Sequence, residues 1–237
     1  MDEITNTDKP QIAYSECYRL PFLSLFHADC MEIMKQYPDK YFDLAIVDPP
    51  YSETFNTNAC ADNKGKKGNY NISTLNGHLP TDEYWSELKR VSKHQIIWGA
   101  NWYGKYFGVG GVCWFKDNTG NYSPCEYAYQ SINNHVHHFK WTWNGMLQQN
   151  MKDKQIRIHP TEKPKQVYEF LIKEFAKTDF KLLDTHFGSG SIALAVDKAN
   201  RLDKMNLHLT ACEIDKEYID KAIKRISESI KQGTLSF

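Results

Sequence analysis

The stretch FDLAIVDPPY, residues 42–51, joins an apolar run to a proline turn. The run is apolar and partly β-branched, so it predicts a strand buried on both faces. Pro49 and Pro50 end this strand, because neither donates a backbone hydrogen bond and each fixes its φ angle. The rim behind the strand carries the Asp48 carboxylate, backbone carbonyls and the Tyr51 ring. Ligands bind at such strand ends in open α/β sheets, although a plain proline turn with a buried tyrosine explains the same residues.

The composition is that of a globular protein rather than a disordered one. Of 237 residues, 41% are hydrophobic and 24% are charged, which predicts one large domain or two small ones. Lys plus Arg and Asp plus Glu both total 29, so the net charge gives no evidence for a polyanionic partner. Six cysteines without a C-x-x-C pair favour reduced thiols. The first residues lack signal-peptide features and no apolar run approaches roughly 20 residues, so we expect a cytoplasmic protein without membrane contact.

A second acidic strand end precedes the first in the chain. Residues 22–26 predict a strand that ends near Asp29, and a short helix follows before the strand that ends at Asp48. This order suits a βαβ unit with both carboxylates at one edge of a parallel sheet. Residues 52–80 are polar instead, and Lys64, Lys66 and Lys67 could contact phosphates there or lie on a solvated loop.

The remaining chain alternates between strands and helices. No repeat or low-complexity linker appears, so we expect a single domain over residues 1–237. Thr81 is a candidate helix N-cap. The predicted strands cover residues 95–99, 111–115, 126–132, 181–184 and 208–212, and the predicted helices begin near residues 81, 165, 191 and 216.

A glycine turn follows the strand at residues 181–184. Gly188 and Gly190 let the backbone approach a ligand, and the helix behind them presents free N–H groups. Glu213 ends the next strand, where it can accept hydrogen bonds from ribose hydroxyls. This pattern predicts a nucleoside site, and it also fits the dinucleotide fingerprint of nicotinamide enzymes. Acidic residues at four strand tips would repel a pyrophosphate, which favours S-adenosylmethionine over NAD.

Several motifs together resemble the DNA amino-methyltransferases, which methylate adenine N6 or cytosine N4. Residues 48–51 resemble the catalytic tetrapeptide of that family, and residues 184–191 resemble its cofactor-binding glycine loop. Residues 213–215 resemble the ribose-binding acid, and residues 159–164 resemble the segment that precedes the glycine loop. Asp29 resembles the acid that contacts the adenosine. The likeness covers roughly residues 20–228, with the catalytic motif first, as in the permuted class labelled β.

The resemblance implies a Rossmann-like methyltransferase fold, with a seven-stranded, mostly parallel sheet between helices. It implies a methyltransferase that uses S-adenosylmethionine and acts on a flipped base in double-stranded DNA, without a metal. Target-recognition elements are expected in residues 52–80 and 133–158, and a homodimer and a cognate restriction enzyme are compatible partners. The implied catalytic residues are Asp48, Pro49, Pro50 and Tyr51. The implied cofactor-binding residues are Asp29, His159, Lys163, Asp184, Phe187, Gly188, Ser189, Gly190, Ser191, Glu213, Ile214 and Asp215.

The sequence leaves alternatives open for the target base and for the class of protein. Relatives that methylate cytosine N4 more often carry Ser where Asp48 stands, so the resemblance favours adenine N6. A non-catalytic binding subunit and a nicotinamide oxidoreductase are the alternatives from other classes. Pro124-Cys125 could suggest cytosine C5 methylation, but it follows no glycine-rich rim. His135, His137 and His138 lack the matching ligands of a metal site.

Overall fold

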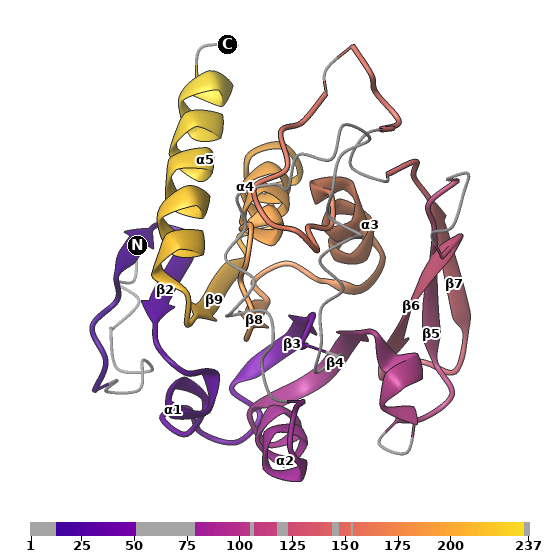
Figure 1. Cartoon of the computed structure of the whole chain (residues 1–237). Helices are drawn as coiled ribbons and strands as arrows, with labels where there is room; N and C mark the ends of the chain where they lie inside the picture. The colour runs from indigo at the N-terminus through magenta and orange to yellow at the C-terminus, as the bar shows by residue number, and fades with distance from the viewer. Residues whose placement is uncertain are drawn as a thin grey trace.

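The computed structural model describes residues 13–50, 79–104, 107–117, 123–143, 147–152 and 154–234. These residues form an α/β fold around one large sheet (Figure 1). In chain order the elements are β1 Tyr18–Leu20, β2 Leu23–His27, α1 Cys30–Met34, β3 Phe42–Val47, α2 Asp82–Val91, β4 Ser92–Trp98, the 3₁₀ helix η3 Ala100–Trp102, β5 Gly111–Phe115, β6 Cys125–Gln130, β7 Val136–Lys140, α3 Lys165–Phe175, β8 Lys181–Asp184, α4 Ser191–Asp203, β9 His208–Glu213 and α5 Lys216–Thr234.

The sheet of the described residues has nine strands in the order β1-β2-β9-β8-β3-β4-β6-β5-β7. The five strands from β2 to β4 in this order are parallel to one another. β6 runs antiparallel to both of its neighbours, and β1 is antiparallel to β2. The chain moves from β3 to β4 in one direction and from β8 to β9 in the other, so the switch point lies between β3 and β8. Ligands bind in open α/β sheets at such a point.

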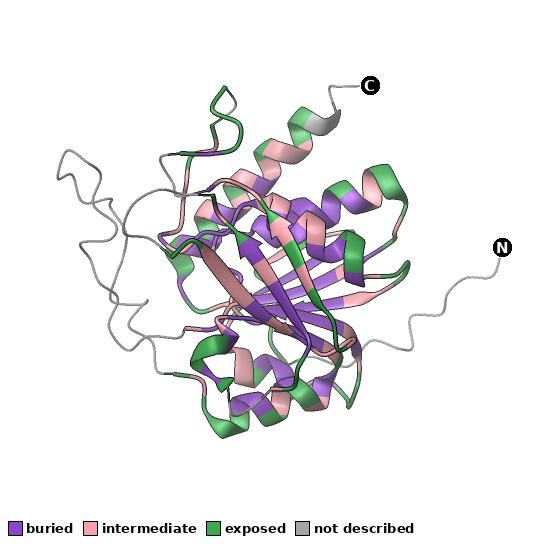
Figure 2. Ribbon diagram, turned by 90° about the vertical axis from the view of Figure 1, so that its right-hand side faces the viewer, coloured by how far each residue is buried: buried purple, intermediate pink, exposed green. Residues whose placement is uncertain are grey.

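Helices cover both faces of the sheet (Figure 1). On one face, α1 and α2 bury a cluster that includes Ile33, Trp85 and Leu88. On the other face, α3, α4 and α5 bury a larger cluster through residues such as Leu171 and Ile226. The central strands are therefore buried on both sides, as Figure 2 shows by its purple strands. This double burial explains why residues 44–47 of β3 are a continuous apolar run rather than an alternating one.

The predicted mostly parallel α/β fold is confirmed, but the sheet is wider than the seven strands that we expected. The two additional strands, β1 and β7, lie at its two edges. β1 has only three residues and β7 contains two histidines and a lysine, so neither carries the apolar signal of a central strand. Among the described residues, no helix is both long and apolar enough to cross a membrane.

Candidate active site

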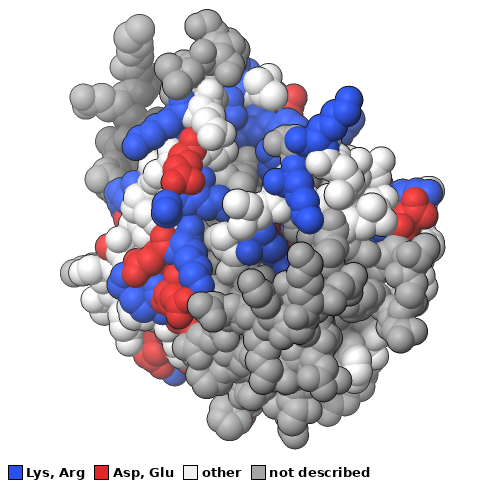
Figure 3. Space-filling model, turned by 45° about the horizontal axis from the view of Figure 1, so that its top comes forward, with Lys and Arg blue, Asp and Glu red and all other residues white. Residues whose placement is uncertain are grey.

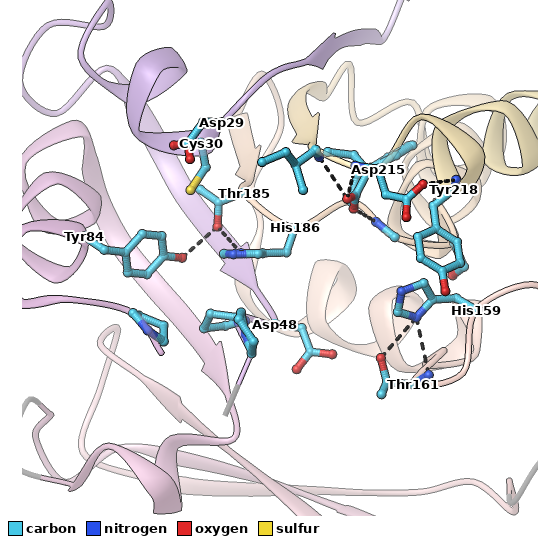
Figure 4. Close-up of a pocket in the computed structure, with 18 of the residues that line it drawn as sticks. Asp29, Cys30, Asp48, Tyr84, His159, Thr161, Thr185, His186, Asp215 and Tyr218 are labelled. Carbon is cyan, nitrogen blue, oxygen red and sulfur yellow. Dashed lines mark hydrogen bonds between the residues drawn. The ribbon is translucent and has the colours of Figure 1, made fainter. Parts of the chain in front are cut away.

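A cavity of about 570 Å³ opens at the carboxyl ends of β2, β3, β8 and β9 (Figure 4). Each strand contributes the residues that follow it. Asp29 follows β2 in the sequence, residues 48–50 follow β3, and residues 185–189 follow β8. Glu213 is the last residue of β9. The parallel arrangement collects these residues at one edge, although β9 and β8 separate β2 from β3 in the sheet.

The two carboxylate oxygens of Asp48 have different surroundings. The Lys163 ammonium, which is itself buried, donates to Oδ2 in a part-buried ion pair. Oδ1 is buried and has no hydrogen-bond partner among the described residues. Burial raises the pKa of Asp48 above its ordinary value, and the Lys163 charge opposes this rise. One acceptor oxygen of Asp48 therefore has hydrogen-bonding capacity that no described residue uses.

The proline rim is held by an aromatic residue that the sequence analysis did not single out. The Tyr103 hydroxyl donates to the Pro50 carbonyl and lies 3.4 Å from the Pro49 carbonyl oxygen. Tyr103 lies directly behind η3 and is buried. A carbonyl oxygen has two lone pairs, so Pro49 can still accept a hydrogen bond from a ligand.

The glycine loop has the backbone that its sequence predicts. Gly188 and Gly190 have φ angles of 50° and 69°, in the left-handed region that glycine adopts without strain. A Cβ atom at Gly190 would lie 3.1 Å from the Phe187 ring and 3.2 Å from Ala222. The loop thus needs glycine at Gly190 for both conformation and space, and the turn leads into the N-terminus of α4.

Glu213 is held by backbone groups on both carboxylate oxygens. Gly188 N donates to Oε2 at 2.8 Å, while Ile214 N and Asp215 N donate to Oε1 at 2.9 and 3.0 Å. Burial raises the pKa of Glu213, and these three N–H groups oppose that rise. The carboxylate is therefore locked in one orientation beside the glycine loop.

Two further acids at the cavity cap helices. Asp29 accepts a hydrogen bond from Met31 N at 2.7 Å and is the N-cap of α1. Asp215 Oδ1 accepts from Glu217 N at 2.8 Å at the start of α5. Each of these bonds satisfies an N–H group that a helix cannot pair internally.

His159 packs against the glycine loop as a neutral ring. Its Nδ1 atom accepts a hydrogen bond from Thr161 N at 3.3 Å and lies 3.1 Å from the Thr161 hydroxyl. Its ring centre lies 4.3 Å from that of Tyr218, and a Cβ at Gly188 would lie 3.7 Å from the ring. Burial, aided by the Lys163 charge, lowers the pKa of His159 to about 3.

Arg225 of α5 connects the glycine loop to the segment that carries His159. It forms an ion pair with Glu162 at 3.0 Å, and its guanidinium lies 3.3 Å from both the Ser189 carbonyl oxygen and the Ser191 hydroxyl. Gln155 Oε1 accepts a further bond from the same guanidinium at 3.4 Å. Sequence reasoning missed this residue, because only the packing of α5 brings it to the loop.

A row of three hydrogen-bonded side chains, which begins on α2, also lines the cavity, and the sequence analysis did not predict it. The Tyr84 hydroxyl lies 2.7 Å from the Thr185 hydroxyl, which lies 2.9 Å from His186 Nδ1 (Figure 4). Burial lowers the pKa of His186 to about 4, so this ring is neutral as well. The helical periodicity of α2 reveals that Tyr84 is buried, but nothing local indicates its partner.

The cavity brings together most of the predicted site residues. Pro164 is the last residue of the predicted segment 159–164, and α3 begins directly after it. Asp184 accepts a bond from His186 N at 3.0 Å beneath the loop, and with Gly190 and Ser191 it is not among the described residues that line the cavity. Tyr51, Lys64, Lys66 and Lys67 lie outside the described residues. The predicted residues that line it are Asp29, Asp48, Pro49, Pro50, His159, Lys163, Phe187, Gly188, Ser189, Glu213, Ile214 and Asp215.

Comparison of the sequence with models of protein families shows to which family the chain belongs. The sequence model of the DNA methylase family N6_N4_Mtase matches residues 96–224, more than half of the chain. The chain belongs to the N6/N4 DNA methylase family. This result confirms the predicted DNA amino-methyltransferase and, with it, S-adenosylmethionine as the methyl donor.

Individual relatives of this DNA methylase agree along most of its length. It is 22% identical to the type II methyltransferase M2.LlaDCHI of Lactococcus lactis subsp. cremoris, over 88% of this chain and 91% of the relative. It is 24% identical to the type II methyltransferase M2.DpnII of Streptococcus pneumoniae, over 85% and 88%.

Solved structures share the fold. The M1.HpyAVI–SAM complex matches with a TM-score of 0.54 at 17% identity, over 86% of this chain and 98% of that one. The cytosine-N4-specific PvuII DNA methyltransferase matches with a TM-score of 0.57 at 13% identity, over 93% and 95%.

The cavity of the DNA methylase fits its cofactor by charge. Among the described residues that line it, one lysine faces five acids, namely Asp29, Asp48, Glu162, Glu213 and Asp215. This balance suits a ligand with cationic sulfonium and amino groups and hydroxyl donors, and it would repel a pyrophosphate. Glu213 and Asp29 both line this cavity, and the acceptance of ribose hydroxyls by Glu213 stays a prediction.

Proposed function

We propose that this DNA methylase transfers a methyl group to the exocyclic N6 of adenine at specific sites in DNA. The observation that carries the proposal is the Asp48 carboxylate, whose Oδ1 is buried without a hydrogen-bond partner among the described residues. Pro49, whose carbonyl is a second acceptor, lines the same cavity. An amino group on a base supplies two N–H donors, which match these two acceptors.

The chemistry requires the amine to become a better nucleophile. Its lone pair is delocalised into the base, so it attacks poorly in a planar geometry. Asp48 Oδ1 and the Pro49 carbonyl would each accept one N–H, which draws the nitrogen toward a tetrahedral geometry and stabilises its developing positive charge. When bound, S-adenosylmethionine would supply the electrophilic methyl group: the sulfur–methyl bond breaks as the nitrogen–methyl bond forms, S-adenosylhomocysteine is the leaving group, and the amine loses one proton to Asp48 or to solvent. The role of Tyr51 as the stacking plate for the base stays a prediction from the sequence.

The target base must leave the duplex to reach this depth, so base flipping is part of the proposal. Exposed Lys152 and Lys154 support a DNA-facing role for residues 147–158, within the predicted recognition element 133–158. Figure 3, which brings the upper end of Figure 1 forward, shows Lys and Arg side chains gathered around that end. We keep the single-domain assignment, a second recognition element in residues 52–80, the homodimer and the restriction partner as predictions.

Cytosine N4 is the second candidate, because a solved structure with the same fold is cytosine-N4-specific. The test is to incubate the purified protein and S-adenosylmethionine with unmodified genomic DNA and to sequence the product with a method that distinguishes both modifications. We expect N6-methyladenine in one short sequence context. N4-methylcytosine would replace the adenine assignment, and unmodified DNA at every base would overturn the proposed activity.

A further inference from the structure

Four charged side chains form a row that begins at the cavity and passes away from it. Asp48 follows β3, Lys163 lies in the segment before α3, Glu126 belongs to β6 and Lys116 follows β5. Lys163 Nζ is paired with Asp48 and lies 3.2 Å from Glu126 Oε2, while Lys116 is paired with Glu126 Oε1. The charges alternate along the row, so each of its three ion pairs joins opposite charges.

The centre of this row is withdrawn from water. The Lys163 side chain is 2% exposed, and its ammonium lies 5.2 Å above the Trp98 ring. A buried ammonium is costly unless carboxylates and hydrogen bonds compensate it, and here Asp48 and Glu126 do so together. The ammonium is held between the Asp48 and Glu126 carboxylates, so its position is fixed by both of them.

This arrangement determines which atom of Asp48 a substrate can use. Lys163 binds Oδ2, which sets the rotation of the carboxylate and leaves Oδ1 unpaired among the described residues. A carboxylate that could rotate would expose either oxygen and would present the amine acceptor in several orientations. Holding an acceptor in place before the reaction is how electrostatic stabilisation becomes effective.

We propose that Lys163 and Glu126 are positioning residues for Asp48, with Lys163 orienting and charge-balancing the carboxylate and Glu126 holding Lys163 between two negative charges. The inference rests on the proposed function of Asp48. It gives Lys163 a role toward Asp48 in addition to the predicted contact with the cofactor.

Two charges in the row act on Asp48 in opposite directions. Lys163 lowers the pKa of Asp48, whereas the like charge of Glu126 raises it. The other groups that face this site are Lys116 behind β5, Asp184 at the end of β8 and Tyr168 on α3. None of these residues is itself replaced in the variants, and Lys116, which loses its ion-pair partner in E126Q, lowers the pKa of Asp48 in the same direction as that substitution. Because a protonated Asp48 cannot accept on both oxygens, its pKa should appear as the acid limb of the rate profile.

The test measures single-turnover methyl transfer against pH for the wild type, K163M and E126Q. We expect the acid limb of K163M to move to higher pH, with a rate loss of at least about 10-fold at neutral pH. We expect the limb of E126Q to move to lower pH, because a like charge has been removed. A change in folding alone would not shift the two limbs in opposite directions, and the KM for S-adenosylmethionine in E126Q should stay within about threefold of wild type.

Three further variants keep the test decisive. K198M removes a lysine from the exposed pair with Glu169, so it should leave the profile unchanged. K163R keeps the charge and should restore the acid limb. If K163M does not fold, the K163M/E126Q double variant also removes the negative charge of Glu126 that would otherwise face Asp48 without Lys163 between them, and its limb should also rise. An active wild type with unshifted limbs in E126Q and in K163M or the double variant would overturn the inference, whereas an inactive wild type would overturn the proposed function instead.

Discussion

The tips of β3 and β9 both present a half-buried carboxylate to the cavity, but they hold it differently. Glu213 receives three backbone N–H groups that use both of its oxygens. Asp48 is held through one oxygen by a side chain and keeps the other unpaired among the described residues. A carboxylate held on both oxygens by backbone groups is suited to shape a binding site, whereas one with an unpaired oxygen can act on a reacting group. The difference predicts binding losses at one tip and rate losses at the other.

The largest effect should come from removing the open acceptor. We expect D48A to lower the rate of methyl transfer by at least about 10²–10³-fold, because the amine loses its charged acceptor. The Kd for S-adenosylmethionine should change by only a few-fold, which single-turnover rates and calorimetry would measure together. D39A, at an exposed aspartate paired with Arg90, is the matched control. A D48A enzyme with near wild-type rates would refute the division between the two tips.

The glycine loop beside Glu213 can be broken at two positions with unequal cost. G190A places a Cβ 3.1–3.2 Å from Phe187, Ala222 and Ile226 at a φ of 69°. Strain and crowding together should lower the free energy of unfolding by about 2–4 kcal/mol. G188A has a φ of 50° but only ordinary contacts near 3.7 Å with His159, so about 1–2 kcal/mol is expected. Thermal or denaturant unfolding of both variants checks the order, and equal losses would contradict the crowding argument.

Changing the Glu213 tip should affect binding first. E213Q removes the negative charge and places an amide N–H₂ group where Oε2 accepts from Gly188 N. The Gly188 N–H of the glycine loop therefore loses its acceptor. We expect the Kd for S-adenosylmethionine to rise about 10- to 100-fold, the scale of hydrogen bonds to a charged group. The rate at saturating cofactor should fall much less. E217Q, in an exposed pair with Lys221 on the same helix, is the control and should bind normally.

The smallest effect concerns Asp184, which lies between the two tips. Burial raises its pKa to about 7, so the folded protein holds this proton where the unfolded chain has lost it. Its contribution to stability is full below pH 3.8 and is lost as the pH rises toward about 7. His159 and His186, with pKa values of about 3 and 4, act in the opposite sense, because the unfolded chain gains their protons below pH 6.5.

Replacing Asp184 should therefore make the free energy of unfolding fall more steeply as the pH is lowered. D184N keeps an oxygen that can accept from His186 N but removes the compensating titration. Between about pH 4.5 and 6, the slope of unfolding free energy against pH should increase by about 1.4 kcal/mol per pH unit. Denaturant unfolding over this range provides the measurement. An unchanged slope would show that Asp184 is ionised in the folded protein throughout.

The sequence by itself determined the features that depend on neighbouring residues. The β3 run with its two prolines, the glycine loop and the acid at the end of β9 follow from backbone preferences and burial, which act within a few residues. The parallel order of strands then brought these ends together, as expected for an open α/β sheet. The edge strands β1 and β7 escaped prediction, because they carry few buried apolar residues.

Only the tertiary structure decided which charged groups meet. Lys163 reaches Asp48 across 115 positions of the chain, and its second partner comes from an antiparallel strand beyond the parallel part of the sheet. Glu126 shares a strand face with buried Ala128 and Gln130, so its position signals a carboxylate in need of a partner. Which partner it finds depends on the packing of three separate elements, because an ion pair has no local sequence pattern. The open oxygen of Asp48 is likewise a product of that packing.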